Sequence, residues 1–467
     1  MLKKINFKFF TFILFSPIFI NFFYNLYFEK KIFNFDIYYF LNVVSIFILF
    51  FNLYLIGRLI KKSLDLPTIS FSICIFLTSF YVFEYILLPF TKNISFKISV
   101  TVVVLLWLFY LTFSKKTNSK DIILVLILIS LSRVFYSFLI ENNILHIGSN
   151  FLTQNLDIVN SVNGDEGYFW FPTTASLFNN NYFTANQVSP IGGYGFLIQH
   201  ITATVHYLFF DLSSFTYYSI TKNVFLLLMF LFISEISTSR NLKYFFSCVV
   251  LLIIFSSHWF RYMFFDSLLG EGIASYLIGS TICIKYNKKY LYYQIFLLSF
   301  LIYSKQFISS IALIFSFYLL FQHRKKMKYY IFTYCHLMLT FLFYFMYKNN
   351  IVWSFYLDTT FGNKETTTYP KFINFFNIIK QFSLDRPISY FLVIIFLTYI
   401  YNNYGKKPIL NNAEKIILLN TFLVFFLYIF LWKEVEFESS YRYLLNTFYL
   451  IIYFAIKQFE TLEKNFH

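Results

Sequence analysis

The chain has 467 residues, of which 58% are hydrophobic, 25% are aromatic and only 13% are charged. This composition excludes a soluble globular protein of such length and indicates a chain that lies in a lipid bilayer. The formal net charge of +16 does not indicate a nucleic-acid partner, because Lys and Arg accumulate in the cytoplasmic loops of membrane proteins. The four cysteines lie in apolar segments without CxxC spacing, so neither a disulfide framework nor a zinc site is expected.

Apolar runs of near-spanning length follow one another along the whole chain, and a span needs about 17–25 residues. We therefore expect an all-α, polytopic integral membrane protein with about 12–15 transmembrane helices and a short interfacial helix in an outer loop. The first run follows a basic start without a clear cleavage site, so it is expected to stay attached. The runs cover residues 7–27, 37–57, 68–89, 97–113, 121–140, 191–210, 217–236, 244–260, 266–284, 291–303, 307–322, 329–347, 388–402, 415–432 and 443–457.

The basic loops predict the orientation of the chain. The stretches GRLIKKSLD, SKKTNSKD, KYNKKY, HRKKMK and NNYGKK should be cytoplasmic, which places residues 141–190, 348–387 and 433–442 outside. The expected organisation is N-terminal transmembrane helices over 1–140, an outer loop with an acidic pair over 141–190, a transmembrane core over 191–347, an outer loop over 348–387, and C-terminal transmembrane helices over 388–467.

One run does not fit this alternation. STSRNLK at 237–243 also has a cytoplasmic charge pattern, yet two runs separate it from the outer loop 141–190. We expect the run 191–210, which contains His200 and His206, to re-enter the membrane or to lie at its surface. Irregular backbone at membrane depth is tolerated only against protein or a wet cavity, so this prediction makes the run part of a site.

Two adjacent carboxylates, Asp165 and Glu166, lie between glycines in the outer loop, just ahead of an aromatic stretch. Pro172 favours an early helical position, so the segment should turn into a short helix, with Tyr168 suited to the membrane interface. Asp165 either caps this helix through its orphan N–H groups, or combines capping with a catalytic or binding role.

A second charged cluster lies in SSHWFRYMFFDSLLGEG. Its members His258, Arg261, Asp266 and Glu271 surround the outer end of one apolar run and the start of the next. Ionisable groups at membrane depth are costly and face a partner or a cavity. The alternative is that Arg261 and Asp266 form an ion pair that joins two helices.

Lys305 lies between two short apolar runs whose far ends are both basic. This position is the outer tip of a shallow hairpin, where an ammonium group either pairs with a lipid phosphate or extends to the membrane interface. The late outer loops offer Arg386 and Arg442, each of which alone also fits a solvated loop residue. The sequence contains no Walker loop, GxGxxG, HExxH or GxSxG motif.

In this order of motifs the chain resembles the GT-C superfamily of membrane glycosyltransferases, which includes aminoarabinose transferases and protein O-mannosyltransferases. The resemblance rests on GDEGYFWFPTTASLF, SPIGGYGFLIQH, RYMFFDSLLGEGIASYLIGS, LIYSKQFISS and YRYLLN, over about residues 141–450. The chain departs from the family pattern in having about five apolar runs before the acidic pair and no soluble domain after the last helices.

The resemblance implies a polyprenyl-phosphate-linked sugar donor and a glycan or lipid acceptor at the outer face of the bacterial inner membrane. Asp165 and Glu166 would be catalytic, with Asp165 as the general base in an inverting transfer. The donor phosphate would be bound by Lys305, Arg261 and Arg386.

The remaining roles also follow from the resemblance. Asp266, His258, Tyr168 and Arg442 would contact substrate. No organic cofactor is implied; Glu166 or Asp266 would orient a hydroxyl group or bind a divalent cation.

Two other functions stay open. An O-antigen polymerase is also polytopic and rich in Phe, but it would more naturally depend on arginine-rich outer loops. A flippase or permease for a lipid-linked oligosaccharide would more naturally show two related halves, and the sequence shows no such repeat.

Overall fold

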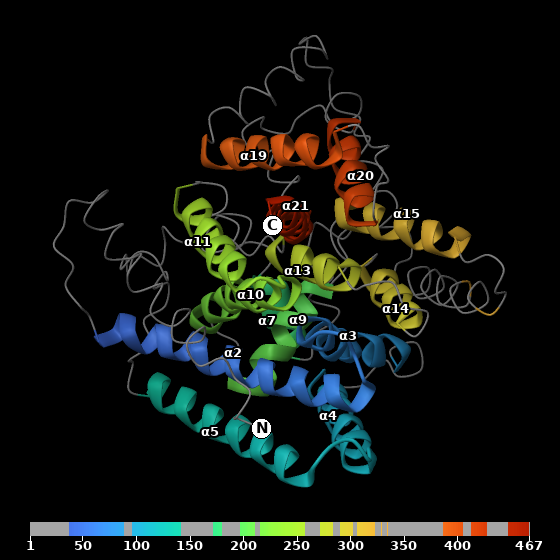
Figure 1. Cartoon of the computed structure of the whole chain (residues 1–467). Coiled ribbons are helices and arrows are strands. Elements are labelled where there is room, and N and C mark those ends of the chain that lie inside the picture. The colour runs from blue at the N-terminus through green and yellow to red at the C-terminus, as the bar shows by residue number, and fades with distance from the viewer. Residues whose placement is uncertain are drawn as a thin grey trace, which may run out of the picture. The chain divides into compact units, whose positions relative to one another are not determined.

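The computed structural model describes residues 37–87, 96–141, 171–179, 197–210, 215–256, 271–283, 290–301, 306–322, 328, 334, 386–404, 412–426 and 447–466. Across these ranges the regular secondary structure is entirely helical (Figure 1). The chain divides into two compact units. Unit 1 contains residues 1–190, 198–231 and 262–272, and unit 2 contains residues 191–197, 232–261 and 273–467.

Unit 1 is built on four long helices and several short ones. The long helices are α2 (Ile37–Leu64), α3 (Ile69–Leu87), α4 (Phe96–Phe113) and α5 (Ser119–Glu141), followed by α7 (Phe171–Phe178), α9 (Leu197–Val205), the π-helix η4 (His206–Phe210) and the larger part of α10 (Phe215–Ile236). Helix α2 packs against both α3 and α5 (Figure 1), and α5 also contacts η4.

The connection between α2 and α3 follows from its local sequence. Asp65 adopts a left-handed conformation with φ of 56°, and Leu66 N donates to Lys61 O at 2.9 Å. This i to i−5 bond after a left-handed residue is a Schellman-type helix end. Thr68 then caps α3, because its Oγ1 accepts a hydrogen bond from Phe71 N at 3.2 Å.

The turn between α4 and α5 is capped in a similar way. Asn118 Oδ1 accepts from Lys120 N at 3.2 Å, and Asn118 O accepts from Asp121 N at 2.9 Å, so Asn118 is the N-cap of α5. Asp121 lies in the first turn of α5, where a carboxylate complements the helix dipole. These caps fix α4 and α5 as a helical hairpin.

Helices α2 and α5 are also joined by polar bonds inside the apolar core. Asn52 Nδ2 donates to Ser132 Oγ at 2.6 Å, and Tyr136 Oη donates to the main-chain oxygen of Ser45 at 2.6 Å. Gly57 brings α2 close to α3, because a Cβ atom at this position would lie 2.6 Å from Ile73 Cγ1. The core of unit 1 therefore combines close apolar packing with satisfied polar groups.

Three helices among the described residues are long and apolar enough to cross a membrane, and all lie in unit 1: Val44–Leu64, Phe96–Phe113 and Ser119–Leu139. On α4 and α5, large apolar side chains point out of the protein; Phe113 is 71% exposed and Val134 is 67% exposed. Water would not tolerate an apolar face of this extent, so the hairpin fits a lipid environment. The expected number of 12–15 spans stays a prediction.

Unit 2 surrounds the C-terminal helix. Its elements are the last turn of α10, α11 (Arg240–Ser256), α13 (Glu271–Ile282), α14 (Leu291–Leu301), α15 (Gln306–Gln322), α19 (Arg386–Asn403), α20 (Asn412–Phe426) and α21 (Phe448–Phe466). Helix α21 contacts α11, α19 and α20. The described residues also contain six shorter apolar helices of 10–17 residues, four of which are parts of α13, α14, α15 and α19.

Helices α13 and α21 cross at very close range. A Cβ atom on Gly279 would clash with the Cβ atom of Tyr449, so only glycine permits this approach. Ser275 Oγ accepts from Tyr449 N at 3.1 Å, which satisfies one of the orphan N–H groups at the start of α21. The two contacts fix the first turn of the C-terminal helix.

The helices follow the predicted apolar runs closely. A short helix, α7, does begin near Pro172 as expected. Two helices extend well beyond the predicted runs: α2 continues past residue 57 to Leu64, and α21 continues past residue 457 to Phe466. In α21, Gln458 bonds to Asn402 of α19 and Glu460 bonds to Thr238 in the connection between α10 and α11.

Candidate functional site

Most of the predicted site residues lie outside the described part of the chain. They are Asp165, Glu166, Tyr168, His258, Arg261, Asp266, Lys305 and Arg442. Arg386 is the first residue of α19, but its side chain also lies outside the described part. The convergence of these groups on one cavity therefore stays a prediction.

In sequence, these positions lie close to described helices. Asp165 is six positions ahead of the first described residue of α7, and Asp266 is five positions ahead of that of α13. Lys305 is one position ahead of the first described residue of α15, and Arg386 is the first described residue of α19.

A buried polar helix occupies the part of the run 191–210 that the structure describes. Nine residues of α9 are followed there by five residues of π-helix in η4. All residues from Leu197 to His206 are buried. Single π-turns are frequent at functional sites.

The polar side chains of this helix face the protein interior. His200 is fully buried between Tyr81 and Phe96, with ring centroids 5.2 Å and 5.3 Å from its own. Thr204 Oγ1 lies 3.4 Å from His200 Nδ1. Gln199 is only 6% exposed, and its Oε1 atom meets no hydrogen-bond partner among the described residues. An unsatisfied buried acceptor is costly, so this position is a candidate for ligand binding.

The π-helix also presents a side chain toward the α4–α5 hairpin. Tyr207 Oη lies 2.9 Å from Thr101 Oγ1, and its ring packs edge-on against Phe178 of α7 at 6.3 Å. Two cations flank these rings: Lys97 Nζ is 4.6 Å from the Phe178 centroid, and Arg133 Cζ is 5.9 Å from the Tyr207 centroid. We call Lys97, Thr101, Arg133, Phe178 and Tyr207 the hairpin cluster.

This cluster ties two predicted functional segments to one hairpin. Helix α7, which follows the acidic pair in sequence, contacts α4. Helix η4, which ends the run 191–210, contacts α5. Within unit 1 the two segments therefore meet the same pair of helices.

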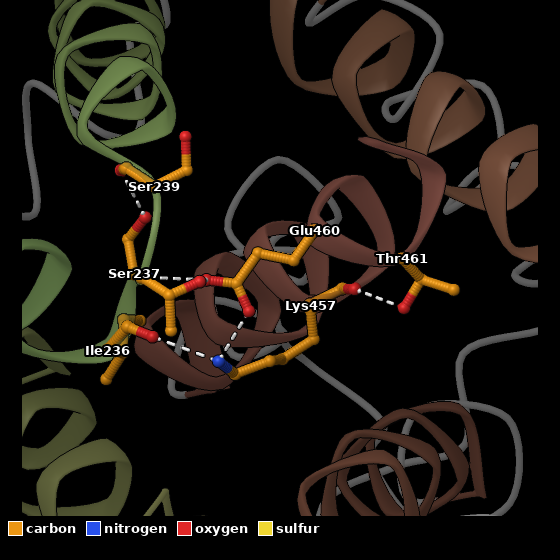
Figure 2. Close-up of polar contacts among 7 residues, drawn as sticks. Ile236, Ser237, Ser239, Lys457, Glu460 and Thr461 are labelled. Carbon is orange, nitrogen blue, oxygen red and sulfur yellow. Dashed lines mark hydrogen bonds and ion pairs between the residues drawn. The ribbon is translucent and has the colours of Figure 1, made fainter. Parts of the chain in front are cut away.

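A second polar cluster lies in unit 2, where α21 meets the connection between α10 and α11 (Figure 2). Glu460 Oε1 accepts from Thr238 N at 2.6 Å and from Thr238 Oγ1 at 2.9 Å. Glu460 Oε2 pairs with Lys457 Nζ at 2.8 Å, and the same ammonium donates to Ile236 O at 3.0 Å (Figure 2). We call this arrangement the α21 clamp.

The charges of the α21 clamp complement two helix ends. Lys457 binds a carbonyl group at the end of α10, and Glu460 binds an N–H group just ahead of Arg240, the first residue of α11. These are the positions where a cation and an anion respectively stabilise a helix. Burial raises the pKa of the Glu460 carboxyl, but the hydrogen bonds from Lys457 and Thr238 outweigh burial and lower the pKa below its ordinary value.

Metal ligation can be assessed only for the described part of the chain. There, His, Cys, Asp and Glu side chains do not gather in groups of three or more. The two acids predicted as alternative cation ligands, Glu166 and Asp266, lie outside that part, so the predicted cation site stays untested.

Sequence analysis missed both the hairpin cluster and the α21 clamp. A signal for the first was present, because Arg133 lies inside an apolar run and an ionisable residue at that depth is by default a functional candidate. For the α21 clamp, the run 443–457 ended at Lys457, and Thr238 lies 222 positions from Glu460. No family model, curated protein or solved structure matches the chain.

Proposed function

We propose that the chain is an inverting glycosyltransferase of the GT-C type, which transfers a sugar from polyprenyl phosphate to a glycan or lipid acceptor. The acceptor belongs to a cell-surface polysaccharide or lipopolysaccharide, and the reaction takes place at the outer face of the bacterial inner membrane. The protein is a polytopic membrane enzyme with the acidic pair of the loop 141–190 in its active site.

The observation that supports this proposal is the order of motifs in the sequence: the acidic pair Asp165 and Glu166 comes first, followed by Asp266, Lys305 and Arg442. The described parts of α15 and α19 begin at Gln306 and Arg386, so Lys305 and Arg386 stand next to or in these helices in sequence. A phosphate group suits such positions, because helix N–H groups and a basic side chain can bind the same anion.

The chemistry of the transfer needs few further groups. The acceptor hydroxyl attacks the anomeric carbon while Asp165 takes its proton, and the bond from that carbon to the phosphate oxygen breaks. The lipid phosphate leaves as a stable anion that needs no protonation, and Lys305, Arg261 and Arg386 stabilise its charge. Glu166 orients the acceptor or binds a divalent cation.

The test is the Asp165→Asn variant, compared with Asp157→Asn from the same loop 141–190. Because removal of a general base costs about 10²–10⁴ in rate, Asp165→Asn should lose sugar transfer in cells that depend on the chain for it. Asp157→Asn should retain transfer at wild-type membrane levels. Near-normal transfer by a folded Asp165→Asn protein would refute the proposal.

The product of the same assay separates the two alternative functions. A single added sugar supports the glycosyltransferase, whereas an extended chain of repeat units identifies an O-antigen polymerase. Movement of a lipid-linked oligosaccharide across proteoliposomes without any sugar transfer identifies a flippase.

A further inference from the structure

We propose that the hairpin cluster is a binding site for the phosphate group of a membrane lipid, with Lys97 and Arg133 as the charged ligands. Neither cation is among the residues proposed to bind the phosphate of the sugar donor. The inference therefore stands independently of that function.

The first argument is the equal depth of the two cations. Helices α4 and α5 are adjacent in sequence and are joined by the capped turn at residues 114–118. Lys97 lies 17 positions before Ser114 and Arg133 lies 15 positions after Asn118, so both side chains are near the end of the hairpin opposite this turn. Because the turn is basic and expected to be cytoplasmic, the two cations are expected at the outer leaflet.

The second argument is the surface around the cations. Lys97 is followed by Ile98, which is 58% exposed, and Arg133 is followed by Val134, which is 67% exposed. Both cations are half-buried at the border of an apolar face that fits acyl chains. A charged side chain at such a border reaches toward the phosphate level of the bilayer.

The third argument is the set of donors that the hairpin cluster combines. Arg133 offers a planar fork that binds two phosphate oxygens, and Lys97 offers a point charge. Thr101 Oγ1 donates to Lys97 O at 2.7 Å and lies 2.9 Å from Tyr207 Oη, so it accepts the Tyr207 proton and helps to hold that ring beside Arg133. Tyrosine is a residue type suited to the membrane interface.

Two lipid sources carry this chemistry: the phosphodiester head group of a phospholipid, and the phosphate monoester of a long-chain alcohol. The chain as a whole is purified in a neutral maltoside detergent, and the two probes are phosphatidylglycerol and dodecyl phosphate. Native mass spectrometry measures the affinity for each probe, with phosphatidylcholine as a zwitterionic comparison.

The decisive variant is the double substitution Lys97→Gln, Arg133→Gln, compared with Lys115→Gln, Lys120→Gln at the opposite end of the same hairpin. The control removes the same charge from exposed positions. Loss of the charge-assisted bonds should weaken binding of at least one anionic probe about tenfold or more in the first variant only. Equal affinity in the wild type and the cluster variant, or an equal loss in the control, would overturn the proposal.

Two conservative substitutions keep the proposal testable if the double variant fails to fold. Tyr207→Phe retains the ring beside Arg133 but removes the hydroxyl that donates to Thr101, so it should weaken the same probe by a smaller factor. A chain with Arg133→Lys should bind the probe more tightly than a chain with Arg133→Gln. Selective loss of dodecyl phosphate assigns the site to a lipid phosphate monoester. Loss of phosphatidylglycerol as well assigns it to a phospholipid head group.

Discussion

Helix α9 in unit 1 and helix α21 in unit 2 both bury polar side chains, but they satisfy them differently. In α21, Glu460 accepts three hydrogen bonds and Gln458 accepts two from Asn402. In α9, Gln199 Oε1 meets no hydrogen-bond partner among the described residues.

This difference separates a structural role from a candidate functional one. Satisfied buried polar groups specify how helices pack, and the partners of α21 are a helix connection and α19. An unsatisfied buried acceptor beside a π-turn costs stability, and such costs persist in proteins at sites that bind ligands. The contrast predicts that substitutions in α21 damage folding, whereas those in α9 damage activity.

The largest expected effect is that of Glu460→Ala. This change leaves the Lys457 ammonium and the Thr238 N–H group without the carboxylate, whose side chain is only 10% exposed. Removal of one partner from a buried pair costs about 3–5 kcal/mol. The unfolding temperature in detergent should fall accordingly.

The matched control is Glu463→Ala on the same helix. Glu463 accepts one bond, from Ser239 Oγ at 3.4 Å, so its loss should change the free energy of unfolding by less than about 0.5 kcal/mol. If both variants unfold at the same temperature, the α21 clamp contributes nothing specific.

Much of the helical organisation could be predicted from the sequence, because apolar runs bounded by Pro, Asn, Thr and charged residues determine helices locally. Helix α3 at Ile69–Leu87 lies within the run 68–89, and α7 follows the signal of Pro172. The limits of these elements depend on caps such as Thr68 and Asn118, which are visible in the sequence.

The polar clusters could not be predicted in the same way. The bond between Thr238 and Glu460 joins residues 222 positions apart, and the contact of Thr101 with Tyr207 joins residues 106 positions apart. Pairings of this kind are decided by helix packing and leave no local pattern. The acidic pair Asp165 and Glu166 shows the converse. Its candidate chemistry can be inferred from the sequence, whereas the residues that it contacts depend on tertiary structure.

A smaller effect on stability is expected when either of two buried amide side chains is replaced. Asn402→Leu removes donors to Gln458 O at 2.8 Å and Gln458 Oε1 at 3.0 Å, which should destabilise unit 2 by about 1–3 kcal/mol. Gln199→Leu removes an acceptor that is already unsatisfied, so the stability should change by less than about 1 kcal/mol. Thermal unfolding of the two variants measures the difference.

The same two variants distinguish an effect on folding from an effect on activity. If the proposed glycosyltransferase function holds, Gln199→Leu should reduce sugar transfer despite near-normal stability. A variant that is both stable and fully active would remove α9 from the candidate site, and greater destabilisation by Gln199→Leu than by Asn402→Leu would reverse the contrast between the two helices.

The smallest expected effect is the acid dependence of the α21 clamp. Glu460 lies beyond the predicted span 443–457, and its folded-state pKa is below the ordinary value of 4.5. A lowered pKa contributes stability that is present above the unfolded-state pKa and is lost as the pH falls through the folded-state pKa.

Glu460→Gln provides the measurement for this dependence. Glutamine resembles the protonated carboxyl, so the gap in unfolding temperature between wild type and variant should be widest near about pH 7 and should narrow below about pH 4.5. The narrowing reports the loss of charge on the Glu460 carboxyl. A gap that stays constant with pH would show that Glu460 stabilises α21 through packing and not through its charge. The contrast between the hydrogen-bonded polar side chains of α21 and the unsatisfied polar side chain of α9 would then rest on Asn402 and Gln458.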